Sequence, residues 1–437
     1  MGLTKVIAFE RGMDRTWAGW LILLSCAVGF LVQVTYYYPG AVSHDAHVAV
    51  NSLQAGQSND WHSPLMAYWM VSAIGLLPDG LAEVAPTVSV LAVFWVGLWL
   101  TARGLFGISK LTGVLAALVG WFPPLFMTMF AFGKDSLMVA CLTFALGCAL
   151  SVDSSRRGQT SCLFFFGWCF LLAAITIRTN AVFAIFPILY IAVLARKWSL
   201  KFWGQLAATV MLWISLVVSS QILTYHVFKA EQAYPLQYVM VSDLFAMNLV
   251  RDEFELPPLL LENTPALTAQ VFEERHTLGP MVDWALWGDF DINLYQVKTD
   301  EEFQTLRDFW LERMASDVGS YLSFKAKFFN SLMTPNGDTA FRWVLFQGWW
   351  YLLAMLMLFG IFLRRLLRED SFFDRTGMAF VLSGLVYLLP YTLLQGGAGF
   401  RFLLWCVAAT VFGLIMLAAS MLFVADETES KRPEFRT

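Results

Sequence analysis

Charge is scarce in this chain. Only 14% of its 437 residues are Asp, Glu, Lys or Arg, whereas 58% are hydrophobic. Apolar runs of membrane-spanning length recur along the sequence, and this combination excludes an ordinary soluble fold. The net charge of -4 also lacks the basic excess that a phosphate-binding surface for DNA or RNA requires, so no nucleic-acid partner is expected. The sequence therefore predicts an integral membrane protein.

Cysteine is also sparse, and its placement excludes two further classes of site. All six cysteines lie inside apolar runs, so the polar regions have neither a disulfide framework nor Cys-based metal spacing. They are most simply interpreted as small buried apolar residues. The chain has no Asn-x-Ser/Thr sequon, which is compatible with a bacterial inner membrane.

Apolar runs predict a mainly α, polytopic helical bundle of about ten spans. The first run is too long for a signal peptide and no Ala-x-Ala site follows it, so it is expected to be a retained span. The predicted spans are 17–38, 86–102, 111–132, 136–152, 162–177, 181–195, 202–224, 343–363, 377–395 and 402–424.

The distribution of Lys and Arg orients these spans. With both termini in the cytoplasm, 17 of the 29 basic residues face inward, and the short outer loops hold only Lys134, Arg178 and Arg401. The other nine lie in one long segment, which is exempt from the positive-inside bias. This arrangement predicts an outward-facing site.

That long segment predicts a separate outer domain. Residues 225–342 carry 18 acidic against nine basic side chains, for a net charge of -9. Apolar residues at helical spacing from Asp300 to Tyr321 predict amphipathic helices, and Val227–Val250 is compatible with strands. We expect a membrane module over 1–224, the acidic domain over 225–342, further spans over 343–424 and a cytoplasmic tail over 425–437.

The first outer loop has no Lys or Arg between Pro39 and Pro86, yet it holds three of the five histidines. Ser43 is a natural N-cap, and the apolar spacing after it predicts a short helix over 44–55. Ser63 followed by Pro64 predicts a second helix that ends near Leu77. Two interfacial helices are therefore expected.

Asp45 lies in the first turn of the first of these helices. A carboxylate there can simply complement the helix dipole, but its position at the bilayer edge also suits a catalytic base. For His62, a helix-entry hydrogen bond and a substrate contact are both open. A metal site built from His44, His47 and His62 is a further alternative, although the three lack adjacent ligand spacing. Because this histidine alternative is open, a divalent cation remains a possible cofactor.

Lys134, Arg178 and Arg401 are isolated cations on the side where the positive-inside rule disfavours them. One interpretation is snorkelling or pairing with nearby Asp135 or Asp45. Because the placement repeats in every short outer loop after the first, we favour binding of a lipid phosphate, for which Arg provides a fork and Lys a point charge.

Together these motifs resemble the GT-C superfamily of integral-membrane glycosyltransferases, in particular the protein mannosyltransferase and lipid A aminoarabinose transferase type. The resembling segments are Ser43-His-Asp45, Asp60-Trp-His62-Ser-Pro64-Leu65, Arg178-Thr-Asn180 and Phe400-Arg401-Phe402. The sequence departs from the family at Ala46, where an acidic residue is common, and at Ser63, where proline is common. The resemblance covers residues 15–225 and 343–424.

The resemblance implies a donor sugar carried on polyprenyl phosphate or diphosphate, transferred with inversion to a glycan or lipid acceptor at the outer face of the bilayer. In that scheme Asp45 is the base, and Lys134, Arg178 and Arg401 bind the donor phosphate. His44, Asp60, His62 and Asp135 are expected to contact substrate. The alternatives are a transporter or flippase of an anionic lipid or solute, an O-antigen polymerase or ligase, and a non-catalytic assembly subunit.

Overall fold

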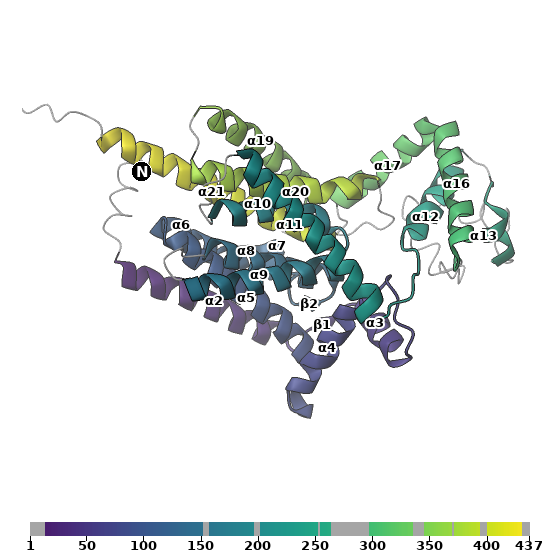
Figure 1. Cartoon of the computed structure of the whole chain (residues 1–437), viewed down its shortest axis with the longest axis horizontal. Helices are drawn as coiled ribbons and strands as arrows, with labels where there is room; N and C mark the ends of the chain where they lie inside the picture. Colours follow the sequence, from purple (N-terminus) through teal and green to yellow (C-terminus); the bar gives the residue numbers. More distant parts are fainter. Residues whose placement is uncertain are drawn as a thin grey trace, which may run out of the picture.

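The structure, a computed structural model, is mainly helical. It describes residues 14–151, 157–195, 202–251, 254–263, 297–334, 345–368, 371–393 and 400–430. Within these residues, seven helices are long and apolar enough to cross a membrane. Figure 1 shows them packed lengthwise into one bundle, with a smaller helical part at one end. This confirms the predicted class, a mainly α polytopic bundle.

Most predicted spans correspond to single long helices of this bundle. They are α2 (Arg15–Tyr36), α5 (Ala85–Phe106), α9 (Arg157–Ile177), α11 (Phe202–Ile222), α19 (Gly348–Leu366), α20 (Phe372–Leu393) and α21 (Leu404–Ser430). Two further apolar helices are shorter, α8 (Lys134–Leu150) and α10 (Ala181–Ala195). A π-helical turn, η3 (Leu223–Val227), continues α11, and a 3₁₀ turn, η6 (Phe400–Leu403), precedes α21.

The run predicted over 111–132 differs, because it is not one helix. It forms α6 (Lys110–Ala117), a 3₁₀ turn η2 (Val119–Trp121) and α7 (Pro123–Phe126). Two successive prolines at 123 and 124 remove backbone donors and force the break. Gln33 of α2 satisfies a backbone carbonyl of the broken run, because its Nε2 donates to the Phe126 carbonyl (2.7 Å). Trp95 of α5 in turn donates from Nε1 to Gln33 Oε1 (2.8 Å). A break inside a membrane bundle needs such internal partners.

The first outer loop has the two helices that the sequence predicted. Helix α3 (His44–Gln54) begins after Ser43, whose hydroxyl accepts from the Ala46 amide, and α4 (Pro64–Leu76) begins after Ser63. Ser63 makes no capping hydrogen bond through its side chain, so Pro64 at the first helical position sets that start. A 3₁₀ turn, η1 (Asp79–Leu81), follows.

The polar insertion, residues 225–342, contributes α12 (Leu236–Arg251), α13 (Pro258–Asn263), α16 (Asp300–Ser316) and α17 (Val318–Met333). The amphipathic helix predicted from Asp300 is confirmed. The strands suggested for Val227–Val250 are wrong, because α12 occupies most of that stretch. One face of α12 packs with α16 and α17 around a separate hydrophobic cluster that includes Leu244, Leu306 and Phe328. That tertiary packing outweighs the β-propensity of its valines.

Helices α5 and α8 approach each other closely through glycine. A Cβ at Gly97 would lie 2.6 Å from the backbone nitrogen of Phe144, and one at Gly147 would lie 2.6 Å from the carbonyl oxygen of Gly97. Small residues at such crossings let two membrane helices approach closely. The approach matters for the site, because α8 begins with Lys134 and Asp135.

We expect Gly97→Ala to lower the free energy of unfolding by about 1–3 kcal/mol, because the added methyl overpacks a backbone contact. Gly75→Ala is the matched control, since no atom lies within 4 Å of a Cβ at Gly75. Thermal unfolding midpoints in detergent micelles measure both. A Gly97→Ala protein as stable as the Gly75→Ala protein would contradict the close α5–α8 packing.

Candidate active site at one end of the bundle

A short parallel strand pair places the start of α3 beside the start of α8. Strand β1 (Ala41–Val42) pairs in parallel with β2 (Ala131–Phe132), and the Ser43 amide donates to the Phe132 carbonyl at 2.8 Å. Each strand is followed at once by a helix, because Ser43 caps α3 and Gly133 precedes α8. Residues 43–46 and 133–136, nearly ninety positions apart, therefore lie side by side.

The pairing brings Lys134 to Asp45. The Lys134 ammonium lies 3.7 Å from Asp45 Oδ2 and donates to the carbonyl of Trp61 at 3.1 Å. Burial by itself raises the pKa of Asp45, but the charges of Lys134 and Arg401 outweigh that effect and hold the pKa below its ordinary 3.8. Asp45 is thus ionised at neutral pH, with its carboxylate partly exposed.

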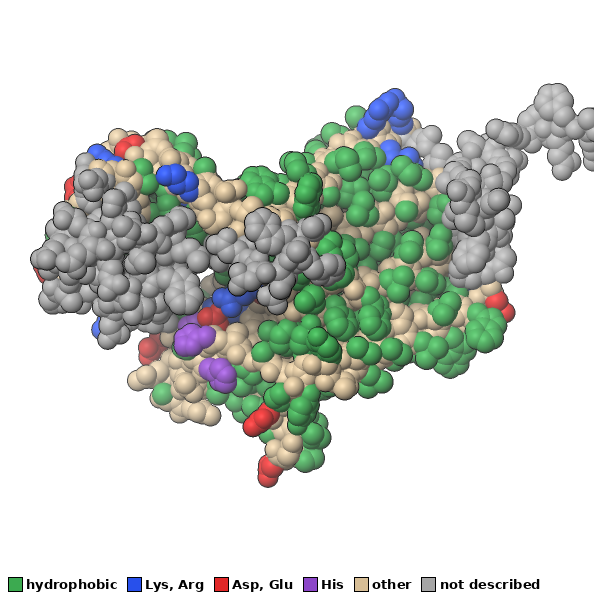
Figure 2. Space-filling model, turned by 180° about the vertical axis from the view of Figure 1, so that it is seen from behind, with side chains coloured by type: hydrophobic (Ala, Val, Ile, Leu, Met, Phe, Trp, Pro, Cys, Tyr) green, Lys and Arg blue, Asp and Glu red, His purple; other side chains and the backbone are tan. Residues whose placement is uncertain are grey.

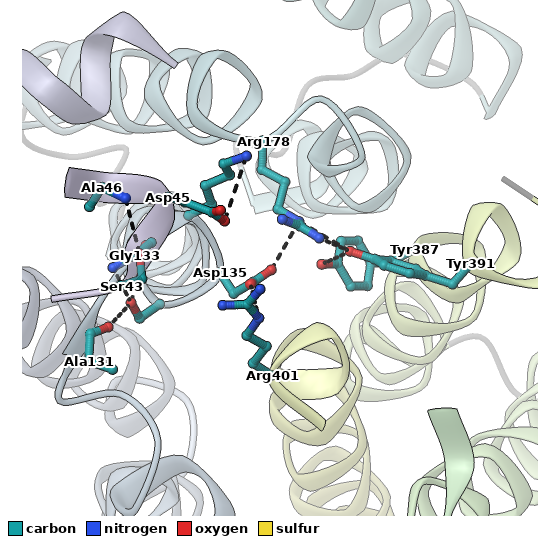
Figure 3. A network of polar contacts seen from close by, with 12 residues as sticks. Ser43, Asp45, Ala46, Ala131, Gly133, Asp135, Arg178, Tyr387, Tyr391 and Arg401 are labelled. Carbon is teal, nitrogen blue, oxygen red and sulfur yellow. Dashed lines mark hydrogen bonds and ion pairs between the residues drawn. The ribbon is translucent and has the colours of Figure 1, made fainter. Parts of the chain in front are cut away.

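Asp135 joins the other two predicted cations. Its Oδ1 lies 2.9 Å from Arg178 Nε, and its Oδ2 lies 3.7 Å from Arg401 Nε. Figure 3 shows the Asp135 carboxylate between the two guanidinium groups, with Asp45 to one side. The Asp135 and Arg178 side chains are only 8% and 12% exposed, whereas Arg401 is 53% exposed. Arg401 therefore keeps a face open to a ligand.

Two tyrosines complete the surroundings of Arg178. Its guanidinium donates to the hydroxyl of Tyr391 at 2.9 and 3.2 Å, and the Tyr391 and Tyr387 hydroxyls are 2.8 Å apart. Both guanidinium groups lie over the ring of Phe402. Its centroid is 4.9 Å from Arg178 Cζ and 5.2 Å from Arg401 Cζ. Sequence reasoning missed both tyrosines; their i, i+4 spacing in an apolar span was the available signal.

His62 lies against this cluster and is 8% exposed. Burial, then the positive charge of Lys134, lowers the pKa of His62 to about 4, so its imidazole is neutral at pH 7. Its Nδ1 is buried without a hydrogen-bond partner among the described residues. His44, in contrast, is exposed at the start of α3. An unpartnered buried nitrogen is costly unless a ligand satisfies it.

Asp60 has a different environment from the other predicted site residues. Its Oδ2 accepts from the Tyr225 hydroxyl (2.6 Å) and its Oδ1 accepts from the Ala233 amide (2.7 Å). Both carboxylate oxygens are therefore bonded to the insertion in this structure.

No group of three or more His, Cys, Asp or Glu side chains with metal-binding geometry occurs among the residues that the structure describes. The carboxylates of Asp45 and Asp135 face Lys and Arg side chains instead.

The site as a whole is a small charged cluster at the end of an apolar bundle. Figure 2 shows histidine side chains beside acidic and basic ones at the end of the bundle nearest the insertion, and a largely hydrophobic surface beyond them. Lys134, Arg178 and Arg401 supply three positive charges against the two carboxylates of Asp45 and Asp135, which leaves one net positive charge. The cluster is suited to bind one anionic group beside an ionised carboxylate.

We expect Asp135→Asn to lower the free energy of unfolding by about 3–5 kcal/mol, because it leaves the buried Arg178 without its carboxylate. The control is Asp308→Asn, since the Asp308 and Arg307 side chains form an exposed ion pair on α16 (2.8 Å). Exposed pairs contribute about 0–1 kcal/mol. Unfolding midpoints in micelles compare the two variants; equal midpoints would contradict a buried Arg178–Asp135 pair.

The buried His62 should make the protein sensitive to acid. Its pKa falls from an ordinary 6.5 to about 4 on folding, so the unfolded chain binds more protons between those values. Stability is therefore complete above pH 6.5 and is lost as pH falls toward 4, by about 3 kcal/mol. His62→Gln should flatten this fall in the unfolding midpoint, whereas His47→Gln, at an exposed position of α3, should not. Parallel pH profiles of all three proteins would refute the assignment.

Comparison with known proteins gives one family match. Residues 62–220 match the family model of dolichyl-phosphate-mannose-protein mannosyltransferase, a range that contains His62, Lys134, Asp135 and Arg178. No curated protein matches this chain at a significant level.

Two solved structures show weak similarity. The apo crystal structure of the Archaeoglobus fulgidus oligosaccharyltransferase has 13% identity and a TM-score of 0.43, covering 94% of this chain and 52% of that one. The Archaeoglobus fulgidus oligosaccharyltransferase AglB, in complex with an inhibitory peptide and a dolichol-phosphate, has 13% identity and a TM-score of 0.42, covering 95% and 52%. The chain thus spans about half the length of these proteins. The family match over residues 62–220, less than half of the chain, agrees with the resemblance to GT-C integral-membrane glycosyltransferases that the sequence motifs carry.

Proposed function

We propose that this protein transfers a sugar from a polyprenyl-phosphate-linked donor to a hydroxyl of a glycan or lipid acceptor, with inversion, at the extracytoplasmic face of the membrane. The observation that carries the proposal is the Asp45–Lys134 pair beside the Arg178–Asp135–Arg401 group, at one end of an apolar bundle. An ionised carboxylate next to a cationic cluster suits a base beside a phosphate-binding site.

The chemistry needs only these groups. The acceptor oxygen attacks the anomeric carbon, its proton passes to Asp45, and the bond from the anomeric carbon to the phosphate oxygen breaks with its electrons on the phosphate. Inversion follows because the acceptor attacks the face opposite the leaving group. A low pKa makes Asp45 a weak base, which suffices where phosphate is already a good leaving group.

Charge balance favours a monophosphate carrier over a diphosphate. A sugar attached to polyprenyl phosphate is a phosphodiester with one negative charge, which equals the single net positive charge of the cluster. When the sugar leaves, the phosphate gains a second negative charge, and Lys134 and the exposed Arg401 can stabilise it as it develops. A diphosphate carrier would begin with an excess of negative charge.

The remaining residues have supporting roles in this proposal. The free Nδ1 of the neutral His62 is available to a hydroxyl of the acceptor or the sugar. His44, exposed at the start of α3, is available to a bound substrate from solvent. Asp135 holds the two arginines at the phosphate site rather than meeting the sugar directly, because both of its oxygens face guanidinium groups.

The cellular context is also proposed. The sequence places 17 of its 29 basic residues in the segments predicted to face inward, which supports cytoplasmic termini and an outward-facing site. We propose the bacterial inner membrane, and an acceptor of the cell-envelope glycan or lipopolysaccharide class.

Asp45→Asn should lower kcat about 10²–10⁴-fold, because an amide cannot take the proton from the acceptor hydroxyl. Lys134→Met should instead raise the KM for donor. The assay uses purified protein in lipid vesicles with radiolabelled undecaprenyl-phosphate sugars and follows label into acceptor. Asp79→Asn is the matched control, since Asp79 is an exposed carboxylate in the same outer loop.

Full transfer activity in a folded Asp45→Asn protein would exclude Asp45 as the base. Movement of the labelled lipid across the vesicle membrane without sugar transfer would support a flippase instead.

A further inference from the structure

The loop between α3 and α4 is tied to the insertion around Asp60. Besides the two bonds to its carboxylate, the Asp60 amide donates to the Glu231 carbonyl (3.1 Å), and the Glu231 amide donates to the Ser58 carbonyl (2.8 Å). Residues 225–235, which connect α11 to α12, thus lie along this loop over several positions. We call residues 225–235 the strap.

The same loop holds the site lysine. One residue after Asp60, the Trp61 carbonyl accepts from the Lys134 ammonium at 3.1 Å. The Trp61 and His62 amides both donate to Asn59 Oδ1, at 3.1 and 3.3 Å. These bonds hold the turn that directs the Trp61 carbonyl toward Lys134. A continuous chain of bonds therefore runs from the strap through residues 59–61 to Lys134, and from Lys134 to Asp45.

Aromatic contacts follow the same path. The rings of Trp61 and Tyr238, the latter on α12, meet edge to face with centroids 5.8 Å apart. Tyr68 on α4 stacks on Phe228 of the strap at 5.1 Å. These two ring contacts join the first outer loop to the insertion at further points beside Asp60.

We propose that Asp60 is a positioning residue: it latches the strap of the insertion to the first outer loop and thereby holds Lys134 at the donor phosphate. This differs from a direct contact between Asp60 and substrate, because each carboxylate oxygen already accepts a hydrogen bond from the insertion. Hydrogen bonds to a charged carboxylate are the strong ones, so these two bonds hold the strap to the loop. The catalytic consequence rests on the proposed function, whereas the latch itself does not.

Limited proteolysis tests the latch without any activity. Lys229 is an exposed trypsin site in the middle of the strap. Asp60→Asn and Tyr225→Phe should each speed cleavage after Lys229 about tenfold, because each removes a bond to the charged carboxylate that holds the strap. Asp79→Asn should leave the rate unchanged. The fragment is identified by mass spectrometry of the full chain in micelles, and equal cleavage rates in all four proteins would overturn the latch.

Transfer kinetics then test the link to Lys134. Asp60→Asn should raise the donor KM about tenfold and leave the acceptor KM unchanged, and Tyr225→Phe should act in the same direction. In a Lys134→Met background, Asp60→Asn should cause no further loss, since it acts through that lysine. A raised acceptor KM, or a loss that adds to that of Lys134→Met, would overturn the positioning role and identify Asp60 as a substrate ligand. If the unmodified protein transfers no sugar, the proposed function fails while the proteolysis result still decides the latch.

Discussion

The pairing of β1 with β2 is the constraint on which the site depends. Two residues from each strand are paired, yet the bond from the Ser43 amide to the Phe132 carbonyl sets where both α3 and α8 begin. Both helices start with charged side chains, so their positive dipole ends and the groups Asp45, Lys134 and Asp135 converge at one place. The glycine contact between α5 and α8 lets these two helices pack closely along the length of α8 that follows Lys134 and Asp135.

Charge balance then explains why the cluster has five members. A guanidinium as buried as that of Arg178 is tolerated near hydrocarbon only with a carboxylate and hydrogen-bond acceptors, and Asp135 with Tyr391 provides them. Arg401, half exposed, shares that carboxylate but keeps an open face. The pairing that stabilises the two arginines near hydrocarbon therefore leaves one net positive charge on the cluster. A phosphodiester headgroup carries the complementary negative charge. Structural pairing and phosphate binding, which the sequence presented as alternatives, are compatible.

The insertion is more than an appendage to the membrane bundle. It has its own hydrophobic cluster, but its first residues bond to the loop that carries Trp61 and His62. Because Lys134 donates to the carbonyl of Trp61, the conformation of the strap and the geometry of the cationic site are physically connected. A soluble part next to a membrane active site can in this way influence the site without contributing a side chain to it.

The sequence by itself determined the membrane class, the two short helices that follow the first span and the identity of the charged residues. Apolar run length, capping by Ser43, Pro64 at a helix start and isolated outer cations are local signals, and each is legible without knowledge of the fold. Local signals failed where tertiary packing decided, since α12 is a helix despite its valines. Pro123 and Pro124 signal the break in the run at 111–132, but the hydrogen bond from Gln33 of another helix to that run could not be read from the sequence. Only the tertiary structure decided which charges pair. Asp135 with Arg178 and Arg401, the tyrosines beside Arg178, and Asp60 with Tyr225 and Ala233 join positions far apart in the chain, and no spacing rule encodes such contacts.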